Sequence, residues 1–421
     1  MTDKFLIEGG KKIEGEIEVG GSKNAAGGVL AATLLTNEDC FIDNVPKVAD
    51  VFTLLDILKG MGVEVEWMGE RKVRIRAGKN VDPLKMDFSR VSKARLSVLL
   101  FGSLLPRFQS FKIASPGGDR IGLRPITTHL RALEELGAKI ERIGDFYNVD
   151  IKKLEGKEIV LSEFSVTATE NLLMAATLSQ GETIIKGAAC EPEILNLGEM
   201  LKKMGGKIEG LGTHQLKVQG VEKLGGVSVE LIPDRLEAGT FLVIGALTPG
   251  ELKIKSMRSE HLDLFLAKLK EINVNFQKEK DSIRVWFSPN LKPTKVQALP
   301  YPGFPTDLLP LVVPLLTQAE GKSLIHDPLY ENRLNYTQEL KKMGADIEIV
   351  DPHRAFVFGK TKLFGVKIES WDIRAGAALL VAGLMAEGRT TIENVEQIDR
   401  GYERIDERLQ KLGAEIKRVN G

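Results

Sequence analysis

Leu136-Gly137-Ala138-Lys139-Ile140 is one of six copies of a short pattern that decides the fold of this chain. In each copy an amphipathic helix runs into a Gly or Asn, and an alternating strand follows. Gly and Asn suit the left-handed backbone that ends a helix. These residues stand 75, 68, 68, 71 and 69 positions apart, at Gly62, Gly137, Gly205, Asn273, Gly344 and Gly413. Spacing this regular predicts six structural repeats, each a small α/β module.

A second helix is expected before each pattern, and its apolar residues are more continuous. Examples are residues 25–35, 171–178 and 375–385. A helix that is apolar on most of its faces belongs in the core, whereas a helix with apolar residues on one face lies at the core's edge. A strand follows the buried helix, as at residues 182–185. Each repeat should therefore follow the order β-α-β-α-β-β.

The first residues of the chain are expected to complete its last repeat. Five repeats continue past the pattern into another strand, but the sixth ends at Gly421. Residues 5–7 and 13–19 alternate like strands and precede the first repeat, so we expect them to supply the missing strands. The chain would then form two α/β domains of three repeats each, one of residues 23–231 and one of residues 1–22 plus 232–421. A cleft between two such domains is a common place for a ligand.

Composition excludes several classes of protein. The 421 residues are 43% hydrophobic, which is enough for two or three domains with their own cores. Lys plus Arg and Asp plus Glu both number 58, so no net charge points to a nucleic acid or a membrane surface. Cys40 and Cys190 lie far apart without a CxxC pair, which disfavours a structural disulfide or a metal site. Without a signal peptide or a membrane-spanning run, we expect a soluble cytoplasmic protein.

One loop, Ser115-Pro116-Gly117-Gly118-Asp119-Arg120-Ile121-Gly122-Leu123-Arg124-Pro125, suggests an anion site. Its glycines let the backbone approach a ligand, and Arg120 and Arg124 suit a phosphate or a carboxylate. Asp119 between them could move a proton. The alternative is a surface turn with solvated charges, since Gly, Pro and Asp occur in turns of every kind.

Polar and charged residues also recur where the chain enters each buried helix. They are Lys23-Asn24, Arg95, Thr169-Glu170, Arg235, Asp307, and Asp372 with Arg374. Helix N-termini attract anions, and basic side chains there would strengthen an anion site. Singly, each has an ordinary explanation: Asp307 or Asp372 could cap a helix, and Arg95 could be a solvated surface charge.

Seven motifs together resemble the enolpyruvyl transferases, most closely the members that act on UDP-N-acetylglucosamine. The motifs are Gly21-Ser22-Lys23-Asn24-Ala25-Ala26, Pro116 to Pro125, Pro233-Asp234-Arg235, Phe304-Pro305-Thr306-Asp307, Glu331-Asn332-Arg333, Asp372-Ile373-Arg374 and Ile398-Asp399-Arg400-Gly401-Tyr402-Glu403-Arg404. The resemblance covers essentially the whole chain. It implies an α/β (α+β) fold of two inside-out domains, each of three repeats, which agrees with the repeat count above.

The resemblance also implies an activity. The enolpyruvyl group of phosphoenolpyruvate would pass to the 3′-hydroxyl of UDP-N-acetylglucosamine, and phosphate would leave by addition and then elimination. This is the first committed step of peptidoglycan synthesis, and it implies no metal and no organic cofactor. Several fixed cations suit a donor that carries both a phosphate and a carboxylate. We expect the protein to act as a monomer, without a nucleic acid or membrane partner.

The resemblance assigns roles residue by residue. The donor would be held by Lys23, Arg124 and Arg400 at its phosphate and by Arg333 and Arg374 at its carboxylate side, the last two also serving domain closure. The sugar nucleotide would contact Asn24, Arg95, Asp307 and Leu329. Asp307 would take the proton from the 3′-hydroxyl, and Lys23 and Asp119 would stand on the acid side.

Asp119 departs from the family's commoner residue, which is cysteine. Neither Cys40 nor Cys190 falls in a matching motif. Fosfomycin acts on this family by alkylating that cysteine, and a carboxylate is a much poorer nucleophile than a thiolate. The sequence therefore predicts insensitivity to fosfomycin.

Two rival functions stay open at this point. The sister enzyme that uses shikimate 3-phosphate typically has Lys-Ser where this chain has Lys23-Asn24, and it lacks the Pro-Gly-Gly-x-x-x-Gly-x-Arg-Pro loop. A non-catalytic homologue that only binds a nucleotide sugar would explain Asp119. Such a homologue has no evident need for Asp307, Arg374 and Arg400 together with Lys23.

Overall fold

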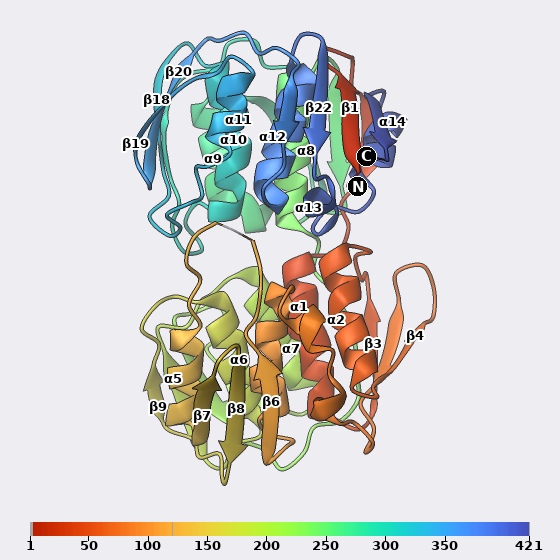
Figure 1. The fold of residues 1–421 in the computed structure, drawn as a ribbon, viewed down its shortest axis with the longest axis vertical. Coiled ribbons are helices and arrows are strands. Elements are labelled where there is room, and N and C mark those ends of the chain that lie inside the picture. Colours follow the sequence, from red (N-terminus) through yellow and green to blue (C-terminus); the bar gives the residue numbers. More distant parts are fainter. Residues whose placement is uncertain (1–2, 120, 421) are drawn as a thin grey trace. The chain divides into compact units, whose positions relative to one another are not determined.

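The structure is a computed structural model that describes residues 3–119 and 121–420. The chain folds into two compact units (Figure 1). Unit 1 comprises the described residues of Met1–Gly20, Asp119–Leu123 and Pro233–Gly421, and unit 2 comprises Gly21–Gly118 and Arg124–Ile232. Each unit has its own hydrophobic core and three of the six sheets.

Unit 2 contains the first three repeats. The first comprises α1 (Lys23–Ala32), η1 (Thr33–Leu35), β3 (Asp39–Asp43), α2 (Ala49–Gly60), β4 (Glu64–Trp67) and β5 (Val73–Arg76). The second comprises η2 (Pro83–Lys85), α3 (Phe88–Val91), η3 (Arg95–Leu99), α4 (Leu100–Leu104), β6 (Ser110–Ala114), α5 (Thr127–Glu135), β7 (Ala138–Ile143) and β8 (Phe146–Ile151). The third comprises β9 (Glu158–Val160), α6 (Val166–Thr177), β10 (Glu182–Lys186), α7 (Pro192–Lys203), β11 (Lys207–Glu209) and β12 (Gln215–Gln219), and β13 (Val227–Glu230) ends the unit.

Unit 1 contains the other three repeats and the start of the chain. It begins with β1 (Lys4–Glu8) and β2 (Gly15–Glu18) and resumes with α8 (Arg235–Leu247), β14 (Glu251–Lys255), η4 (Ser259–Leu262), α9 (Asp263–Glu271), β15 (Asn275–Lys278) and β16 (Ser282–Trp286). The fifth repeat comprises β17 (Lys295–Gln297), η5 (Thr306–Leu308), α10 (Leu309–Thr317), β18 (Gly321–His326), α11 (Thr337–Lys342), β19 (Asp346–Asp351) and β20 (Arg354–Gly359). The sixth comprises β21 (Lys367–Glu369), α12 (Ile373–Met385), β22 (Arg389–Glu393), α13 (Glu396–Asp399), α14 (Ile405–Lys411) and β23 (Glu415–Val419).

The expected β-α-β-α-β-β order is confirmed by the sheets. In the third repeat β9 and β10 are parallel, joined through α6, and β12 lies antiparallel between β10 and β11. The strand order β9-β10-β12-β11 recurs in the fifth repeat as β17-β18-β20-β19. The second repeat has a sheet of three strands, β6-β8-β7, because none of its described residues forms the first parallel strand.

The two N-terminal strands join different sheets. β1 lies between β22 and β23, with Phe5 opposite Ile392 and Arg418, so the start of the chain does complete the sixth repeat. The prediction for residues 13–19 is wrong, because β2 pairs in parallel with β14 of the fourth repeat. β13 pairs in the same way with β3 of the first repeat. At two of the passages between the units, after Gly20 and after Ile232, a strand is thus separated from the helix that follows it in other repeats.

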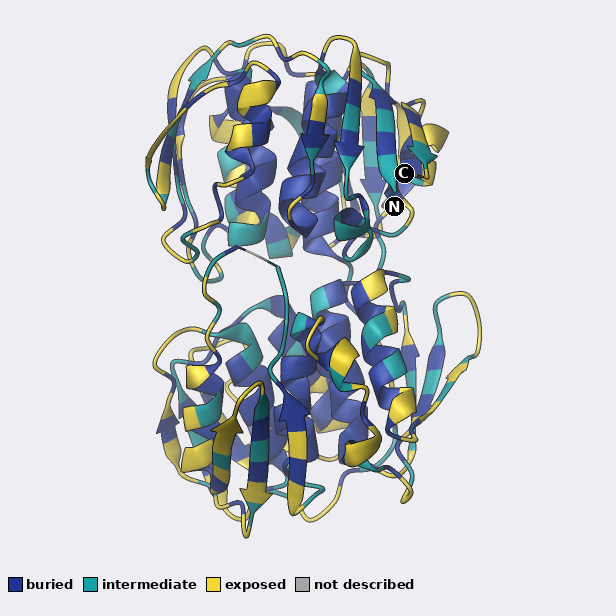
Figure 2. Ribbon diagram, viewed as in Figure 1, coloured by how far each residue is buried: buried dark blue, intermediate teal, exposed yellow. Residues whose placement is uncertain are grey.

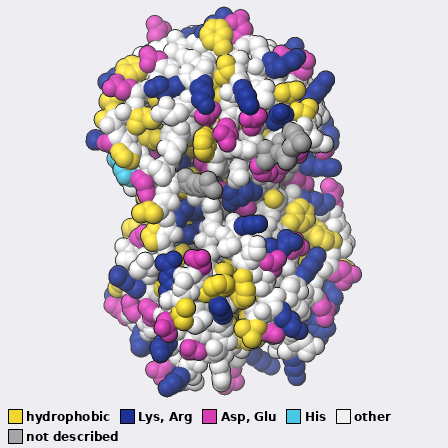
Figure 3. Space-filling model, in the orientation of Figure 1, with side chains coloured by type: hydrophobic (Ala, Val, Ile, Leu, Met, Phe, Trp, Pro, Cys, Tyr) yellow, Lys and Arg dark blue, Asp and Glu magenta, His cyan; other side chains and the backbone are white. Residues whose placement is uncertain are grey.

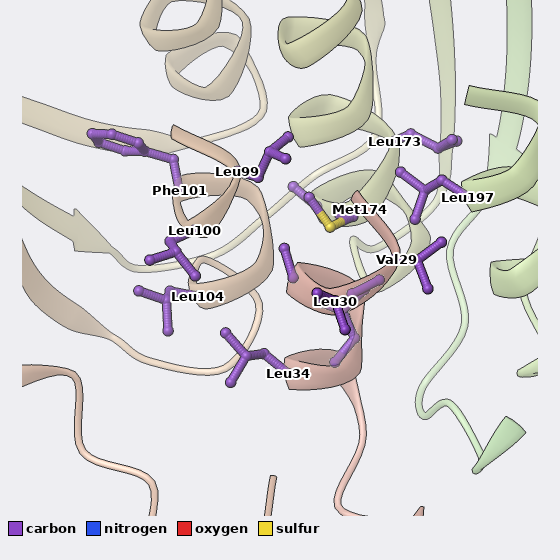
Figure 4. Packing of buried hydrophobic residues seen from close by; sticks show 14 of the residues in the cluster. Val29, Leu30, Leu34, Leu99, Leu100, Phe101, Leu104, Leu173, Met174 and Leu197 are labelled. Carbon is purple, nitrogen blue, oxygen red and sulfur yellow. The ribbon is translucent and has the colours of Figure 1, made fainter. Parts of the chain in front are cut away.

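Apolar helices form the centre of each unit, as the sequence predicts. All thirteen residues of α8 are buried, and buried residues concentrate on the inner helices while the outer faces of the sheets are exposed (Figure 2). In unit 2, Leu30 of α1, Leu100 of α4 and Met174 of α6 pack in one cluster (Figure 4). The six residues expected to end the second helices all have positive φ angles, from 70° to 121°.

Close contact of α4 with α6 requires Gly102. A Cβ atom added there would lie 2.3 Å from the backbone oxygen of Asn171, so no side chain fits. The Asn171 side chain is fully buried and accepts the Gly102 N–H at 2.6 Å. It also donates to the carbonyl of Val98 at 3.0 Å. A buried amide with these partners fixes how the two helices meet.

No described helix is long and apolar enough to cross a membrane. Acidic and basic side chains are mixed over the visible face of each unit (Figure 3). Cys40 and Cys190 are both buried and free.

Candidate active site

In unit 1, Asp307 lies between two buried arginines. Its carboxylate accepts a hydrogen bond from Nη2 of Arg333, and Nε of Arg374 lies 3.5 Å from its Oδ2. The two guanidinium side chains are 1% and 3% exposed, whereas Asp307 is 31% exposed. Asp307 is the second residue of η5, whose N-cap is Pro305, so the interpretation of Asp307 as a helix cap is wrong. Its carboxylate is the accessible part of this cluster.

Both arginines remain cations despite their burial. Burial alone would lower the pKa of Arg333, but the carboxylates of Asp307, Asp372 and Asp327 raise it above its ordinary value. The same holds for Arg374: burial lowers its pKa, but the effects of Tyr402 and Asp307 are larger together and raise the pKa above its ordinary value. Cations fixed in a place of low dielectric bind anions more strongly than solvated ones.

Asp372 has the ordinary role that its position suggests. Its side chain caps α12 by accepting the N–H groups of Arg374 at 2.8 Å and Ala375 at 2.9 Å. Burial raises the pKa of Asp372, and the nearby Arg333 partly offsets that effect. The cap therefore fixes the backbone from which the Arg374 side chain projects.

Tyr402 and Thr240 support Arg374. The Arg374 guanidinium carbon lies 5.3 Å from the centre of the Tyr402 ring, and the interaction with the Tyr402 phenol oxygen raises the pKa of Arg374. That oxygen is 2.8 Å from the hydroxyl of Thr240 on α8. Because all three side chains are buried, Arg374 has little freedom to move.

Asp119 pairs with Arg400, also within unit 1. Nη1 of Arg400 donates to the Asp119 carboxylate and, at 3.1 Å, to the side-chain oxygen of Gln397. The two charged side chains are only 15% and 17% exposed. Arg120, the other arginine of the loop, lies outside the described residues.

Glu331 holds the tip of the same loop. Its carboxylate accepts the Leu123 N–H at 2.7 Å, which lowers the pKa of Glu331. The Asn332 N–H donates to the Ile121 carbonyl at 3.1 Å. The loop is therefore bonded through its own backbone, and the interpretation as a plain solvated turn is wrong.

In unit 2, Lys23 and Asn24 begin α1. Ser22 caps this helix by accepting the Ala25 N–H at 3.2 Å. The Lys23 side chain is 11% exposed, and its Nζ lies 3.2 Å from Oδ2 of Asp50 on α2. Asn24 is half-buried. A buried ammonium group held by one carboxylate at a helix N-terminus suits an incoming anion.

Arg95 and Arg124 lie close together in unit 2. Arg95 begins η3 and donates to the Arg124 carbonyl at 3.0 Å, so it is not a solvated surface charge. Gly118 has φ +137°, and a Cβ there would lie 2.9 Å from Nη1 of Arg124 and 3.1 Å from Cβ of Arg95. Burial and the charge of Arg95 lower the pKa of His129 to about 3, so this imidazole is neutral.

The comparisons with known proteins cover the whole chain. The EPSP synthase (3-phosphoshikimate 1-carboxyvinyltransferase) family matches residues 7–409. The chain belongs to this family of enolpyruvyl transferases. Two relatives are 44% identical: one from Koribacter versatilis over 99% of this chain and 96% of its own length, and one from Carboxydothermus hydrogenoformans over 100% and 99%. They are named UDP-N-acetylglucosamine 1-carboxyvinyltransferase and UDP-N-acetylglucosamine 1-carboxyvinyltransferase 1.

Solved structures show the same fold. The enolpyruvyl transferase NikO from Streptomyces tendae matches with a TM-score of 0.91 and 23% identity over 100% of this chain and 99% of its own. EPSP synthase from Acinetobacter baumannii matches with a TM-score of 0.75 and 20% identity over 100% of both chains. The expected two-domain inside-out fold of this enolpyruvyl transferase is thereby confirmed.

The sequence did not predict several of the residues that the structure places in or near these clusters. Asp327 lies 3.8 Å from Nε of Arg333, and Asp50 pairs with Lys23. Cys190 lies 3.0 Å from His214, although they are 24 residues apart. A carboxylate directly after a strand, as in His326-Asp327, was the one available signal for Asp327.

Proposed function

We propose that this enolpyruvyl transferase passes the enolpyruvyl group of phosphoenolpyruvate to the 3′-hydroxyl of UDP-N-acetylglucosamine. The observation that carries the proposal is the accessible Asp307 carboxylate between the buried cations Arg333 and Arg374. The names of the two relatives at 44% identity favour this acceptor over shikimate 3-phosphate. Such a reaction would serve peptidoglycan synthesis in the cytoplasm.

The residues of unit 1 would provide the base and most of the donor's anion contacts. Asp307 takes the proton from the 3′-hydroxyl, whose oxygen attacks C2 of phosphoenolpyruvate. Arg374 and Arg333 face the donor carboxylate, and Arg400 faces its phosphate. Leu329, 41% exposed, contacts the sugar nucleotide.

Four residues of unit 2 are assigned by the family motifs to the same two substrates. Lys23 and Arg124 bind the donor phosphate, and Asn24 and Arg95 contact the sugar nucleotide. The hydrogen bond from the Arg95 guanidinium to the Arg124 backbone carbonyl holds the Arg95 side chain beside Arg124. Their charges then need little reorganisation when the substrates bind.

Asp119 and Lys23 would supply the acid side of the reaction. Addition requires a proton at C3 of the donor, which converts the methylene to a methyl group and leaves a phosphate-bearing ketal. Elimination removes that proton again and expels phosphate, which restores the double bond. Because Asp119 pairs with Arg400, the donor phosphate competes for that guanidinium and frees the carboxylate to take part.

A phosphate-release assay tests the proposal. The enzyme should release phosphate from phosphoenolpyruvate only when UDP-N-acetylglucosamine is present, and mass spectrometry should detect the enolpyruvyl product. Asp307→Asn should lower kcat about 100- to 10,000-fold, since a lost general base has that cost. The exposed control Asp281→Asn should keep wild-type activity. Ligand binding without phosphate release would instead favour a non-catalytic protein.

A further inference from the structure

Asp327 is a buried carboxylate that touches three parts of the candidate site. It follows β18 and is fully buried. Its Oδ1 accepts the backbone N–H groups of Leu329 at 2.9 Å and Tyr330 at 3.2 Å. Its Oδ2 accepts the hydroxyl proton of Thr306 at 2.5 Å. Since no solvent reaches Asp327, it does not contact substrate itself.

Thr306 is also hydrogen-bonded to Arg333, so its hydroxyl links Asp327 to this arginine. The Thr306 hydroxyl has one proton, which it donates to Asp327, so its oxygen is free to accept. It accepts from Nε of Arg333 at 3.1 Å, while that Nε lies 3.8 Å from Oδ2 of Asp327. With Nε engaged, the planar guanidinium has a fixed orientation, and its Nη2 donates to Asp307.

The same interaction fixes the backbone that carries Asp307. Thr306 and Asp307 are neighbours in η5, so a side chain that anchors Thr306 also anchors the turn. Leu329 is held at its own N–H by the other oxygen of Asp327. One carboxylate thus restrains the base, its arginine partner and a residue proposed to contact the sugar nucleotide.

We propose that Asp327 and Thr306 are a positioning pair for the reaction. They set the geometry of Asp307 and Arg333, and this inference rests on the function proposed above. The pair aims the carboxylate of Asp307 and keeps the cation beside it. Misplacement of a reacting group by about 1 Å costs about 100-fold in rate. Loss of the hydrogen bonds that Thr306 makes with Asp327 and Arg333 should therefore lower kcat without abolishing substrate binding.

Substitutions at Thr306 test the pair with the least risk to folding. Thr306→Val keeps the shape but removes the hydroxyl, and Thr306→Ser keeps the hydroxyl. We expect Thr306→Val to lower kcat about 10- to 100-fold with a smaller change in the KM for UDP-N-acetylglucosamine. Thr306→Ser should restore most of the activity. Thr390→Val is the matched control, because the Thr390 hydroxyl is buried without a hydrogen-bond partner among the described residues.

The pH profile separates positioning from a merely structural role. A carboxylate beside a poorly placed cation binds its proton more readily. The acidic limb of the kcat profile should therefore move to higher pH in Thr306→Val, and stay in place in Thr306→Ser and Thr390→Val. A folded Thr306→Val variant with the wild-type kcat and the wild-type acidic limb would overturn the proposal.

A second readout keeps the test independent of the proposed function. Wild-type protein that releases no phosphate would refute the function, and the Arg333 Nε–H would then be followed by NMR. We expect slow exchange of this proton in wild type and Thr306→Ser and fast exchange in Thr306→Val. Equal exchange rates of this proton in all three proteins would show that Thr306 and Asp327 do not hold Arg333.

Discussion

Glu170 of α6 is a buried carboxyl group whose charged form the fold disfavours. It is 2% exposed, and its Oε1 has no hydrogen-bond partner among the described residues. A Cβ added at Gly28 of α1 would lie 2.6 Å from that oxygen, so α1 packs directly against it. Burial, and then the charges of Glu193 and Glu191, raise the pKa of Glu170 well above 4.5.

This raised pKa makes the stability of unit 2 depend on pH. A carboxyl group with a raised pKa in the folded state contributes stability that is fully present below its unfolded pKa of 4.5 and is lost as pH rises through the folded pKa. The loss is about 1.4 kcal/mol for each pH unit between the two values. Glu170→Gln keeps the shape and carries no charge at any pH. The variant should therefore gain about 1.4 kcal/mol per pH unit over wild type between pH 4.5 and the folded pKa of Glu170, and a constant amount above that pKa.

The assay compares unfolding of wild type, Glu170→Gln and the exposed control Glu222→Gln in denaturant from pH 4 to pH 8. Hydrogen exchange of the α6 amides reports on unit 2 separately from unit 1. The free energy of unfolding of Glu170→Gln should exceed that of wild type by a margin that grows as the pH rises from 4.5, and the two should agree below pH 4.5. Equal free energies of unfolding of wild type and Glu170→Gln across the whole range would show that the fold does not raise the pKa of Glu170.

Three further predictions follow from the contacts. Fosfomycin should not inactivate the wild-type enzyme, whereas Asp119→Cys should be alkylated at the new thiol; a wild-type adduct at Asp119, detected by mass spectrometry, would contradict this. Tyr402→Phe should lower kcat/KM for phosphoenolpyruvate about 5-fold, because the ring beside Arg374 loses its hydrogen bond of about 1 kcal/mol to Thr240; unchanged steady-state kinetics would count against the support seen for Arg374. Gly102→Ala should destabilise unit 2 by about 1–3 kcal/mol through its clash with Asn171, and an unaltered unfolding midpoint would show that the helices separate freely.

The repeat pattern predicted most of the fold, because local signals carry it. Helix periodicity and the Gly or Asn after each helix depend on nearby residues, and all six positions adopt the expected left-handed backbone. The sheet that residues 13–19 join was predicted wrongly. Its partner β14 lies more than 230 residues further on, and alternation alone does not say which sheet a strand joins.

The candidate site was predictable only in part. Motifs identified Asp307, Arg333 and Arg374, and the structure brings them together in unit 1. The roles of Thr306 and Asp327 depend on which oxygen faces which donor, and no residue pattern encodes that. The pairing of Asp119 with Arg400 likewise joins residues 281 apart.

The choice of acceptor is the sharpest test of the proposed activity. The measurement is kcat/KM for phosphate release from phosphoenolpyruvate with UDP-N-acetylglucosamine and with shikimate 3-phosphate, in wild type and in Asp119→Asn. We expect turnover with UDP-N-acetylglucosamine alone and a strong loss in Asp119→Asn, whose amide does not donate a proton as an acid. Turnover with shikimate 3-phosphate alone, or full activity of Asp119→Asn, would contradict it.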